Sequence, residues 1–525
     1  MRGQHQISVT PEIPHTEWDV IVIGSGLTGL VTAVTLALKA KKVLVIEQHY
    51  VPGGYASCFK RRGFTFEVSL HQTVALGEGG YLNKILTQLG VMDKITPIPL
   101  DSTLKLKTDL GDLYVGPEYL DELSRMFPEE AEGVEELATL IDSIMSETQR
   151  AMMLSSLPRQ IRRVLARLIT PTIFRLHRQT LADILDAHFV DDRLKQLIAI
   201  QAGYYGLPQD RISGMFYLLD WGGFLRSGIY YLKGTSQSLS NALVERLEEL
   251  GGTVMLRQEA EEIIIEEGRA VGVRSRRVRR NGDGRAREFR APVVVSNANP
   301  FYTFSRLLDG EKHIPQSYRD IMANLEPSSS AVVGYIGLDC PFETFSRDRH
   351  HSVVETHLDA LDVNRTYREA VAGRNVGFDG VIHYTGMDPD LAPPGKSVIS
   401  TIRNEFTTAW KGLSDAAYSA KKAEVTEEIL ADLERRFPGI REHVEVMEVG
   451  TPRTMTRYTN NSDGAFNGFA YTVDRVGMFD GGLPAKTPVK GLYLASAWVE
   501  AVGGGHAGSI PSGFILGRRI ARARK

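Results

Sequence analysis

Apolar residues near the start of the chain form two short continuous runs separated by a segment of helical periodicity. Val20–Ile23 and Val43–Ile46 are apolar at every position, which is typical of strands buried on both faces of a parallel sheet. The segment between them, from about Thr28, has the periodicity of an amphipathic helix. A strand, a helix and a second strand in this order predict a βαβ unit.

Beyond this unit, the pattern separates a long helical region from a later region of mixed elements. Residues from about Pro117 to Leu219 are predicted to be almost wholly helical. Strands are predicted at Leu104–Lys107, Leu113–Val115, Thr253–Leu256, Glu262–Glu266, Ala331–Leu338, Val398–Asn404, Val444–Glu448 and Gly491–Trp498. Helices are predicted at Tyr81–Leu89, Ser240–Leu250 and around Glu424–Arg436. The chain is therefore predicted to be an α/β protein interrupted by a helical insertion.

The turn between the first predicted strand and helix has the pattern G-x-G-x-x-G. Gly24 allows the tight turn, Gly26 lets the backbone approach a pyrophosphate, and Gly29 lets the helix pack close to the strand. The free N–H groups at the helix start, near Leu27 and Thr28, favour the negative charge of the pyrophosphate. We therefore predict a dinucleotide-binding turn.

The residues after the second strand distinguish a flavin site from a nicotinamide site. Glu47 ends this strand, where its carboxylate can accept hydrogen bonds from ribose hydroxyls. Gly53 and Gly54 follow, where a nicotinamide dehydrogenase would continue into its next helix. This pattern resembles the FAD superfamily of amine oxidases, phytoene desaturases, carotenoid isomerases and retinol saturases, whose Gly-Gly loop passes along the cofactor. The resemblance implies FAD, and it adds Ser57 to the cofactor contacts.

Residues 59–71 look like the polyene branch of that superfamily, which carries a "GF-x-F-D-x-G-x-H" type segment. This chain departs from the pattern at Glu67, where aspartate is usual, and at Ser69, where glycine is common. His71 matches the histidine of retinol saturase-like sequences. The resemblance implies that this histidine lies near the isoalloxazine ring.

Later segments match the same family in the same order. Residues 230–239 resemble its "YYPKGGSQAL" segment, and the strand after it implies an adenine contact at about Ala260. Asn297 lies in a match to "VVSNAxP" and is expected to contact the cofactor. Residues 450–468 resemble the segment "TPxxxxRYT…GAxxG".

The C-terminal residues resemble the family element "GLYLAGxW…PGGGxxGAxxSG". The resemblance implies that Gly504, Gly505 and Ile510 lie where a helix N-terminus faces the flavin end of the cofactor. Residues 503–508 also read as a second G-x-G-x-x-G. A second nucleotide site is not expected there, because no further strand with its acid follows before Lys525.

Together these matches imply a Rossmann-like, glutathione-reductase-like fold with an interleaved mixed-sheet domain. We predict a discontinuous FAD-binding domain formed by residues 19–100, 225–300 and 485–525. A helical insertion or lid is predicted over 117–222, and a substrate-binding domain over 301–484.

Composition restricts the partners. The chain of 525 residues is 42% hydrophobic and 24% charged, with a net charge of −3, which argues against nucleic-acid binding as the main role. Eight arginines between Arg274 and Arg290 are interpreted as a solvated edge ribbon. Two cysteines provide no disulfide framework, and no histidine spacing indicates a metal site. The N-terminus lacks the apolar region of a secretory signal, so a cytoplasmic location is expected.

One basic segment of the helical region is a candidate membrane contact. Residues 152–178 place leucines and isoleucines at helical spacing, with Arg159, Arg162, Arg163 and Arg167 between them. Acidic residues are absent from positions 151–181. Such a segment is typical of a peripheral helix on a membrane surface, here the inner face. An internal helix with a solvated basic face is the open alternative.

The chemistry expected is that of a flavin placed over a carbon–carbon bond. Candidate acid–base residues are His71, Glu500, His506 and Tyr231, each near a cofactor-proximal motif, with packing roles as the alternative. The resemblance implies an FAD-dependent oxidoreductase acting on C–C or C=C bonds of a long hydrophobic polyene, carotenoid- or retinoid-like. His71 favours saturation or isomerisation. An external electron donor or acceptor is expected, because the chain has no built-in site for NAD(P)H.

Three alternatives stay open from the sequence. A phytoene-type desaturase would pass electrons to quinone or oxygen. An amine oxidase is possible within the superfamily, although its substrate aromatic pair cannot be identified. Rab escort and GDP-dissociation-inhibitor proteins share the fold and carry lipids without redox chemistry. The intact glycine motifs and Glu47 argue against such a carrier, which need not keep a flavin site.

Overall fold

A five-stranded parallel sheet holds the predicted βαβ unit. The computed structural model describes residues 17–153, 165, 167–278, 284–308, 310–348, 350–355, 362–374, 380–475, 482–499 and 505–523. The sheet has the order β10 (Thr253–Met255), β2 (Val43–Ile46), β1 (Val20–Ile23), β14 (Val293–Ser296) and β20 (Leu492–Leu494), with all pairs parallel. The predicted bounds of β1 and β2 are confirmed, and every residue of both strands is buried.

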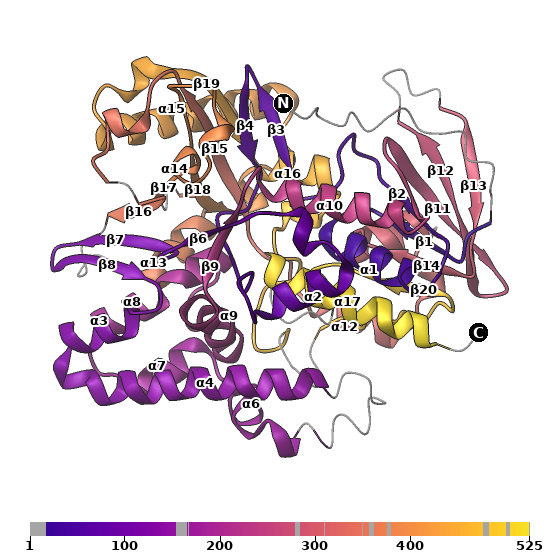
Figure 1. Ribbon diagram of the computed structural model, residues 1–525, viewed down its shortest axis with the longest axis horizontal. Coiled ribbons are helices and arrows are strands. Elements are labelled where there is room, and N and C mark those ends of the chain that lie inside the picture. The colour runs from indigo at the N-terminus through magenta and orange to yellow at the C-terminus, as the bar shows by residue number, and fades with distance from the viewer. Residues whose placement is uncertain are drawn as a thin grey trace.

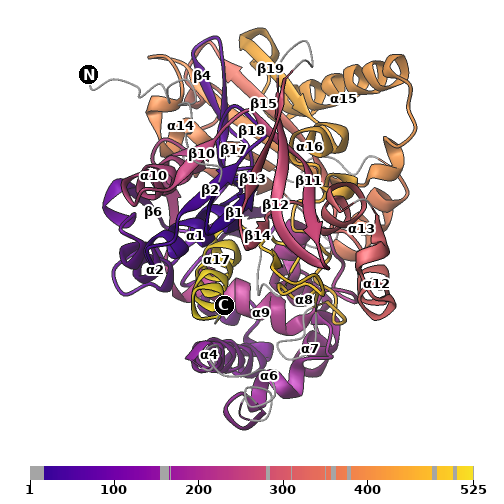
Figure 2. The same cartoon turned by 90° about the vertical axis from the view of Figure 1, so that its right-hand side faces the viewer.

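This sheet lies between a helical layer and a small antiparallel sheet, as Figure 2 shows. The helical layer contains α1 (Leu27–Ala37), α2 (Tyr81–Leu89), α10 (Ser236–Glu249) and α17 (Gly505–Arg522). The antiparallel sheet contains β11 (Gln258–Glu266), β12 (Arg269–Arg277) and β13 (Ala286–Arg290). α1 and α17 pack closely because α17 has a glycine at the contact: a Cβ at Gly513 would lie 2.6 Å from the carbonyl oxygen of Thr28.

The last strand is shorter than predicted. β20 ends at Leu494, whereas the sequence indicated a strand to Trp498. The chain leaves the sheet because Ser496, Ala497 and Trp498 turn to line a cavity.

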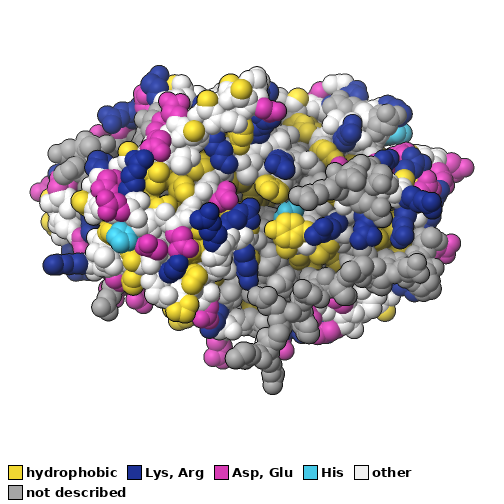
Figure 3. All heavy atoms as spheres, turned by 90° about the horizontal axis from the view of Figure 1, so that it is seen from above, with side chains coloured by type: hydrophobic (Ala, Val, Ile, Leu, Met, Phe, Trp, Pro, Cys, Tyr) yellow, Lys and Arg dark blue, Asp and Glu magenta, His cyan; other side chains and the backbone are white. Residues whose placement is uncertain are grey.

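The arginines of β12 and β13 pair with acids on neighbouring strands. Arg274 forms ion pairs with Glu262 and Glu288, and Arg290 forms one with Glu266. Such exposed pairs contribute little stability. Figure 3 shows acidic and basic side chains interspersed on one face of the molecule.

A seven-stranded mixed sheet forms the second large layer, at the upper left of Figure 1. Its order is β19 (Val444–Gly450), β15 (Ser330–Leu338), β18 (Ser397–Glu405), β17 (Gly380–His383), β16 (Ser352–Glu355), β7 (Leu104–Thr108) and β8 (Gly111–Val115). β7 and β8 thus join strands far away in the sequence. α15 (Asp415–Arg436) buries Val425, Ile429 and Leu433 in the cluster that contains Val332 and Ile336 of β15.

The helical insertion, at the lower left of Figure 1, builds most of a second hydrophobic core, to which β7 and β8 also contribute. It comprises α3 (Tyr119–Met126), α4 (Ala131–Met153), α6 (Pro171–Leu176), α7 (Leu181–His188), α8 (Asp192–Ala199), η4 (Ile200–Tyr205) and α9 (Gly214–Arg226). The prediction of an almost wholly helical region is therefore confirmed for the described residues. No helix among them is long and apolar enough to cross a bilayer.

Short elements connect these parts. They are β3 (Cys58–Arg61), β4 (Phe64–Glu67), β5 (Thr73–Val74), β6 (Pro97–Leu100), β9 (Ile229–Leu232), α11 (Pro300–Tyr302), α12 (Gln316–Ala323), α13 (Val363–Val371), α14 (Tyr384–Met387) and α16 (Pro452–Thr459). β5, β9 and β6 form a three-stranded sheet next to the insertion, and β3 pairs with β4 in a hairpin.

Candidate active site

A cavity of about 370 Å³ connects the glycine turn with the helical insertion. Backbone and small side chains from the turn after β1, the end of β2 and the start of β11 line one end. Side chains from β15, β18, η4 and α9 line the other. At the start of α17, four residues also line the cavity: Gly505, His506, Ala507 and Ser509. We call the two ends the cofactor end and the substrate end.

The glycine turn brings backbone N–H groups to the cofactor end. Helix α1 starts after Gly26, which caps it without a side-chain hydrogen bond, so the first N–H groups of the helix are available to an anion. A Cβ at Gly26 would lie 2.4 Å from Oδ1 of Asn297, and one at Gly29 would lie 2.8 Å from the carbonyl oxygen of Gly24. Gly24, Gly26, Leu27, Thr28 and Asn297 line the cavity, whereas Gly29 lies behind its wall.

Glu47 fixes the shape of this turn. Its Oε2 accepts hydrogen bonds from the backbone N–H and the hydroxyl of Ser25, at 2.8 and 2.7 Å. Its Oε1 accepts one from the backbone N–H of His49 at 2.7 Å. The side chain is buried but lines the cavity, at the end where a ribose is predicted. Its contact with the ribose stays a prediction.

The Gly53–Gly54 loop lies directly against the glycine turn. The N–H of Gly53 donates to the carbonyl of Ser25 at 3.0 Å, and both loop glycines have positive φ, 119° and 61°. From α10, Ser240 donates to the carbonyl of Ala56 at 2.7 Å. Ser57, predicted to touch the cofactor, donates to the carbonyl of Gly54 and lies off the cavity wall.

Glu67, the residue that departs from the family's aspartate, holds the start of α10. Its two oxygens accept hydrogen bonds from the N–H and the hydroxyl of Ser236, both at 2.7 Å. Burial raises the pKa of Glu67 to about 7, against the effect of these hydrogen bonds. Both oxygens are thus occupied by structural contacts, and the residue is absent from the cavity wall.

The remaining predicted cofactor residues fall on two other elements. Ala260 of β11 lines the cofactor end. Gly505 and His506 line the cavity at the start of α17, whereas Ile510 is buried behind it. Gly504 and Glu500 lie outside the described residues. The N-termini of α1 and α17 therefore reach the same cavity.

These residues fit a flavin nucleotide. A long slot begins at the end of β2 and passes the uncapped N-terminus of α1, the Gly53–Gly54 loop and the start of α17. Two helix dipoles are available for negative charge on a diphosphate and on a reduced flavin ring. Gly26 and Gly53 contribute no side chain to this slot, and a Cβ at either would lie within 2.4 Å of a neighbouring atom.

His71 lies at the substrate end with an uncharged imidazole. Its Nδ1 shares a hydrogen bond with the hydroxyl of Tyr204 at 3.0 Å, and Gln72 donates to the same hydroxyl. Burial lowers the pKa of His71 to about 4, and burial likewise lowers the pKa of His506 to about 4. Both histidines are therefore neutral at pH 7, so neither is a strong proton donor there.

Tyr231 is placed away from the cavity. It is fully buried on β9 and absent from the cavity wall, and its ring lies 5.9 Å from that of Tyr384. Its hydroxyl has no hydrogen-bond partner among the described residues, and burial raises the pKa well above the ordinary value. A direct role of Tyr231 in proton transfer stays a prediction.

The structure also places Tyr205 and Asp220 on the wall of the substrate end, which the sequence did not single out. The hydroxyl of Tyr205 donates a hydrogen bond to Oδ2 of Asp220. A sequence signal was present: residues 214–226 form an apolar helix with a single acid. An isolated acid on an otherwise apolar helix marks a group held at an internal surface.

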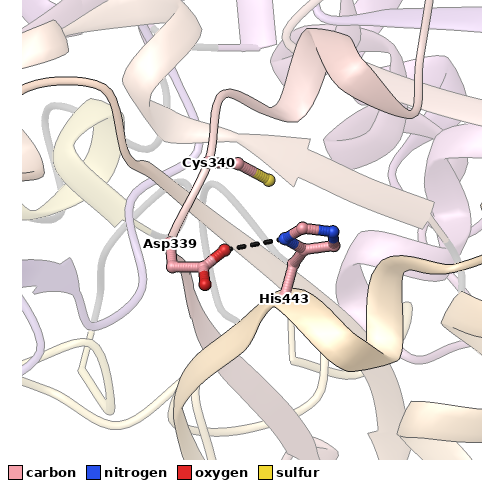
Figure 4. A group of neighbouring side chains, drawn as sticks. All are labelled: Asp339, Cys340 and His443. Atoms are coloured by element: carbon pink, nitrogen blue, oxygen red, sulfur yellow. Dashed lines mark hydrogen bonds and ion pairs between the residues drawn. The ribbon is translucent and has the colours of Figure 1, made fainter.

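One cluster of possible metal ligands lies outside this cavity. Among the described residues, Asp339, Cys340 and His443 bring one ligand atom each within 4.8 Å of one another. Figure 4 shows the carboxylate of Asp339 facing the ring of His443, with an O–N distance of 2.8 Å. Asp339 is solvent-exposed, and none of the three residues lines the cavity.

Comparison with known proteins gives a consistent result. A family model described as flavin-containing amine oxidoreductase matches residues 27–522. Prolycopene isomerase 2 of an Oncidium hybrid cultivar is 30% identical over 496 residues, covering 91% of this chain and 79% of that protein. All-trans-retinol 13,14-reductase of Danio rerio is 27% identical over 530 residues, covering 95% and 86%.

Solved structures support the fold alone. A putrescine oxidase variant superposes with a TM-score of 0.61 at 17% identity, covering 97% of this chain and 98% of that one. An oxidoreductase from Methanosarcina mazei superposes with a TM-score of 0.60 at 19% identity, covering 96% and 99%.

Proposed function

The chain belongs to the flavin-containing amine oxidoreductase family, and we propose that it is an FAD-dependent enzyme acting on carbon–carbon double bonds of a hydrophobic polyene. Membership in this family confirms the flavoprotein resemblance and the expectation of an enzyme. The protein is a flavin oxidoreductase related to carotenoid isomerases and retinol saturases. FAD, the polyene and the direction of the reaction are the parts that we propose.

The observation that carries this proposal is the single cavity with two unlike ends. The cofactor end is lined by the glycine turn after β1, the acid at the end of β2 and the start of β11, the arrangement of a dinucleotide site, which favours FAD over a mononucleotide. The substrate end is walled by Leu70, Val74, Val333 and Ile402 together with aromatic rings, a surface that suits an apolar chain. Two relatives bear the names of enzymes acting on prolycopene and all-trans-retinol, which are both polyenes.

When bound, the flavin supplies two-electron chemistry to a carbon–carbon bond placed over its ring. The protein binds and orients both molecules and keeps water out. The start of α17 lines the cavity near the predicted position of the ring, and the neutral His71 with Tyr204 lines the substrate end. Saturation or isomerisation is favoured, with an external electron donor for saturation.

Product masses test this proposal directly. The purified protein is first examined for the absorption bands of bound FAD, whose absence would contradict the flavin site and revive the lipid-carrier alternative. The flavin-loaded protein is then incubated with phytoene-like, carotenoid, retinoid and acyl polyenes, with and without a reductant. A gain of two mass units indicates a saturase, and unchanged mass with altered retention indicates an isomerase. A loss of two indicates the desaturase alternative. No change in any polyene, together with oxidation of amines in a parallel incubation, would contradict the polyene substrate.

We further propose that the helical insertion docks on the inner face of a membrane. Arg159, Arg162 and Arg163 lie outside the described residues, but Leu168 and Phe174 are 74% and 37% exposed. Exposed apolar side chains next to arginines suit an anionic bilayer surface.

Flotation with anionic liposomes tests this contact. Replacing Leu168 and Phe174 with Glu is expected to reduce membrane binding at least about tenfold, because two charges would enter the acyl boundary. Leu110→Glu is the control, since Leu110 is 56% exposed on the turn between β7 and β8. Equal flotation of the wild-type protein and the double variant would contradict the membrane surface.

A further inference from the structure

The helical insertion places a carboxyl group, that of Asp220, on the wall of the substrate end. Asp220 and Phe224 lie one turn apart on α9, and both line the cavity. Trp221 and Leu225, on another side of the same helix, are buried in the core of the insertion. The acid is therefore carried by the helical insertion, whereas the cofactor end is built around the parallel sheet.

Asp220 has a hydrogen-bond donor but no cation. Tyr205 donates to its Oδ2, and across the described part of the chain no Lys, Arg or His forms an ion pair with it. Burial raises the pKa of Asp220 to about 6, while the hydrogen bond from Tyr205 acts in the opposite direction. Without a cation, the protonated carboxyl is the less costly form in this apolar wall.

The ionisable groups around Asp220 are neutral near pH 7. Four tyrosines from different elements interact with it electrostatically: Tyr205 of η4, Tyr217 of α9, Tyr81 of α2 and Tyr471 of the loop after residue 469. Burial raises the pKa of each above the ordinary value. Because His71 and His506 are also uncharged, Asp220 is the described group at this end of the cavity that titrates between pH 5 and 7.

We propose that Asp220 is the proton donor to a carbon of the bound polyene, with Tyr205 as its positioning residue. The inference rests on the proposed function. In saturation, a bound flavin reduced by an external two-electron donor would supply a hydride to one carbon of the double bond. The O–H bond of Asp220 breaks, a C–H bond forms at the neighbouring carbon, and the carboxylate regains a proton from water.

Isomerisation uses the same proton without a net redox change. The proton adds to one carbon, the resulting delocalised cation allows rotation about the weakened bond, and the proton returns to the carboxylate. In both reactions the protonated carboxyl is the active form, so the rate of turnover falls as the pH rises through the pKa of Asp220.

The test compares three variants of the flavin-loaded protein across pH 5–8. Asp220→Asn is expected to lower kcat/KM by about 100-fold or more and to remove the falling limb near pH 6. Tyr205→Phe is expected to move the limb to higher pH, because the hydrogen bond that favours the carboxylate is lost. Asp142→Asn is the control: Asp142 is an exposed residue of α4 paired with Arg226, and this variant keeps the wild-type rate and profile.

An infrared titration of the carboxyl C=O band gives a second measurement, which does not need turnover. A component titrating near pH 6 is expected in the wild-type protein and in Asp142→Asn and is missing in Asp220→Asn, whereas the component of Glu67, whose pKa is raised to about 7, is present in all three proteins. Absence of such a titration in the wild-type protein would overturn the proposal even if Asp220→Asn fails to fold.

The remaining outcomes separate this inference from the proposed function. If Asp220→Asn keeps the rate and the falling limb while polyene turnover proceeds, only the proton-donor role is overturned. If the wild-type rate rises with pH through the same range, Asp220 acts as a base and the donor role is again overturned. If the wild-type protein converts no polyene, both the proposed function and this inference are overturned.

Discussion

The two ends of the cavity are built from different kinds of atoms. The cofactor end is lined in large part by backbone, at Gly24, Gly26 and the Gly53–Gly54 loop, and neighbouring atoms leave no room for a Cβ at Gly26 or Gly53. The substrate end is made of side chains, among them His71 and Asp220, from segments far apart in the sequence. A backbone-lined end fixes what is bound, whereas a side-chain-lined end can change its chemistry without changing the fold.

The largest effect is therefore expected at a loop glycine of the cofactor end. In Gly53→Ala, the new Cβ would lie 2.1 Å from the carbonyl oxygen of Ala56, at a residue whose φ is 119°. The resulting strain is expected to cost several kcal/mol and to remove at least about 90% of the bound flavin. The ratio of flavin to protein absorbance after purification measures this loss.

Gly203→Ala is the matched control, because a Cβ at Gly203 meets no atom within 4 Å. This residue lies on η4 in the helical insertion. Retention of full flavin content by Gly53→Ala would mean that the loop moves easily, and the contrast between the two ends would be lost.

The second prediction concerns stability and is made at the substrate end. The pKa of Asp220 is about 6 in the folded protein, above its ordinary value, so between about pH 4 and 6 the folded state holds more protons than the unfolded state. Stability contributed by this residue is present at low pH and is lost as the pH rises through about 6. The cost of ionisation above that pH is at most about 3 kcal/mol.

Asp220→Asn removes this cost. Its free energy of unfolding relative to the wild-type protein is expected to increase by at most about 3 kcal/mol between pH 4.5 and pH 8. Urea unfolding of both proteins at the two pH values measures the difference. An unchanged difference would show that the carboxyl ionises as readily as in water.

A third, smaller effect is expected at Glu47. Ser25 and His49 donate to different oxygens of Glu47, so Glu47→Gln keeps an acceptor for one of them and places an amide NH₂ group against the other. The dissociation constant of FAD is expected to increase about tenfold, equivalent to about 1.4 kcal/mol, because hydrogen bonds to charged groups are the stronger ones. Titration of the apoprotein with FAD measures this value. Unaltered affinity would show that Glu47 supports the glycine turn without contributing to FAD binding.

The cofactor end was predictable because its parts are local. A strand, a glycine turn and a helix depend on residues within a few turns of one another, so β1 and β2 have the predicted bounds. The loop at Gly53 and Gly54 could be recognised from the sequence for the same reason. The position of Ser57 could not be recognised, because its contact with the carbonyl of Gly54 depends on the path of the loop rather than on residue type.

The substrate end was less predictable because its contacts are long-range. His71 and Tyr204 lie 133 positions apart, and no periodic pattern connects them. A contact outside the cavity shows the same effect. His443 and Asp339 lie 104 positions apart and meet because β15 and β19 pair. The importance of Asp220 depends on the absence of a nearby cation, which is a property of the packed structure and not of the helix that carries it.

The smallest effect is expected at His71, the residue that the sequence favoured most as an acid–base group. Its imidazole is neutral above about pH 4, and Gln72 donates a second hydrogen bond to the Tyr204 hydroxyl that it contacts. His71→Phe is therefore expected to keep full flavin content and to lower kcat/KM by about fivefold, the value of one neutral hydrogen bond. The pH profile between 5 and 8 is expected to stay that of the wild-type protein, because the lost group does not titrate in that range. Gln72→Leu is the comparison variant, with a loss of similar size. Two results would falsify the assignment of proton transfer to Asp220 of the helical insertion: a loss of 100-fold or more for His71→Phe alone, or the disappearance of the falling limb near pH 6. Either result would assign proton transfer to His71 instead.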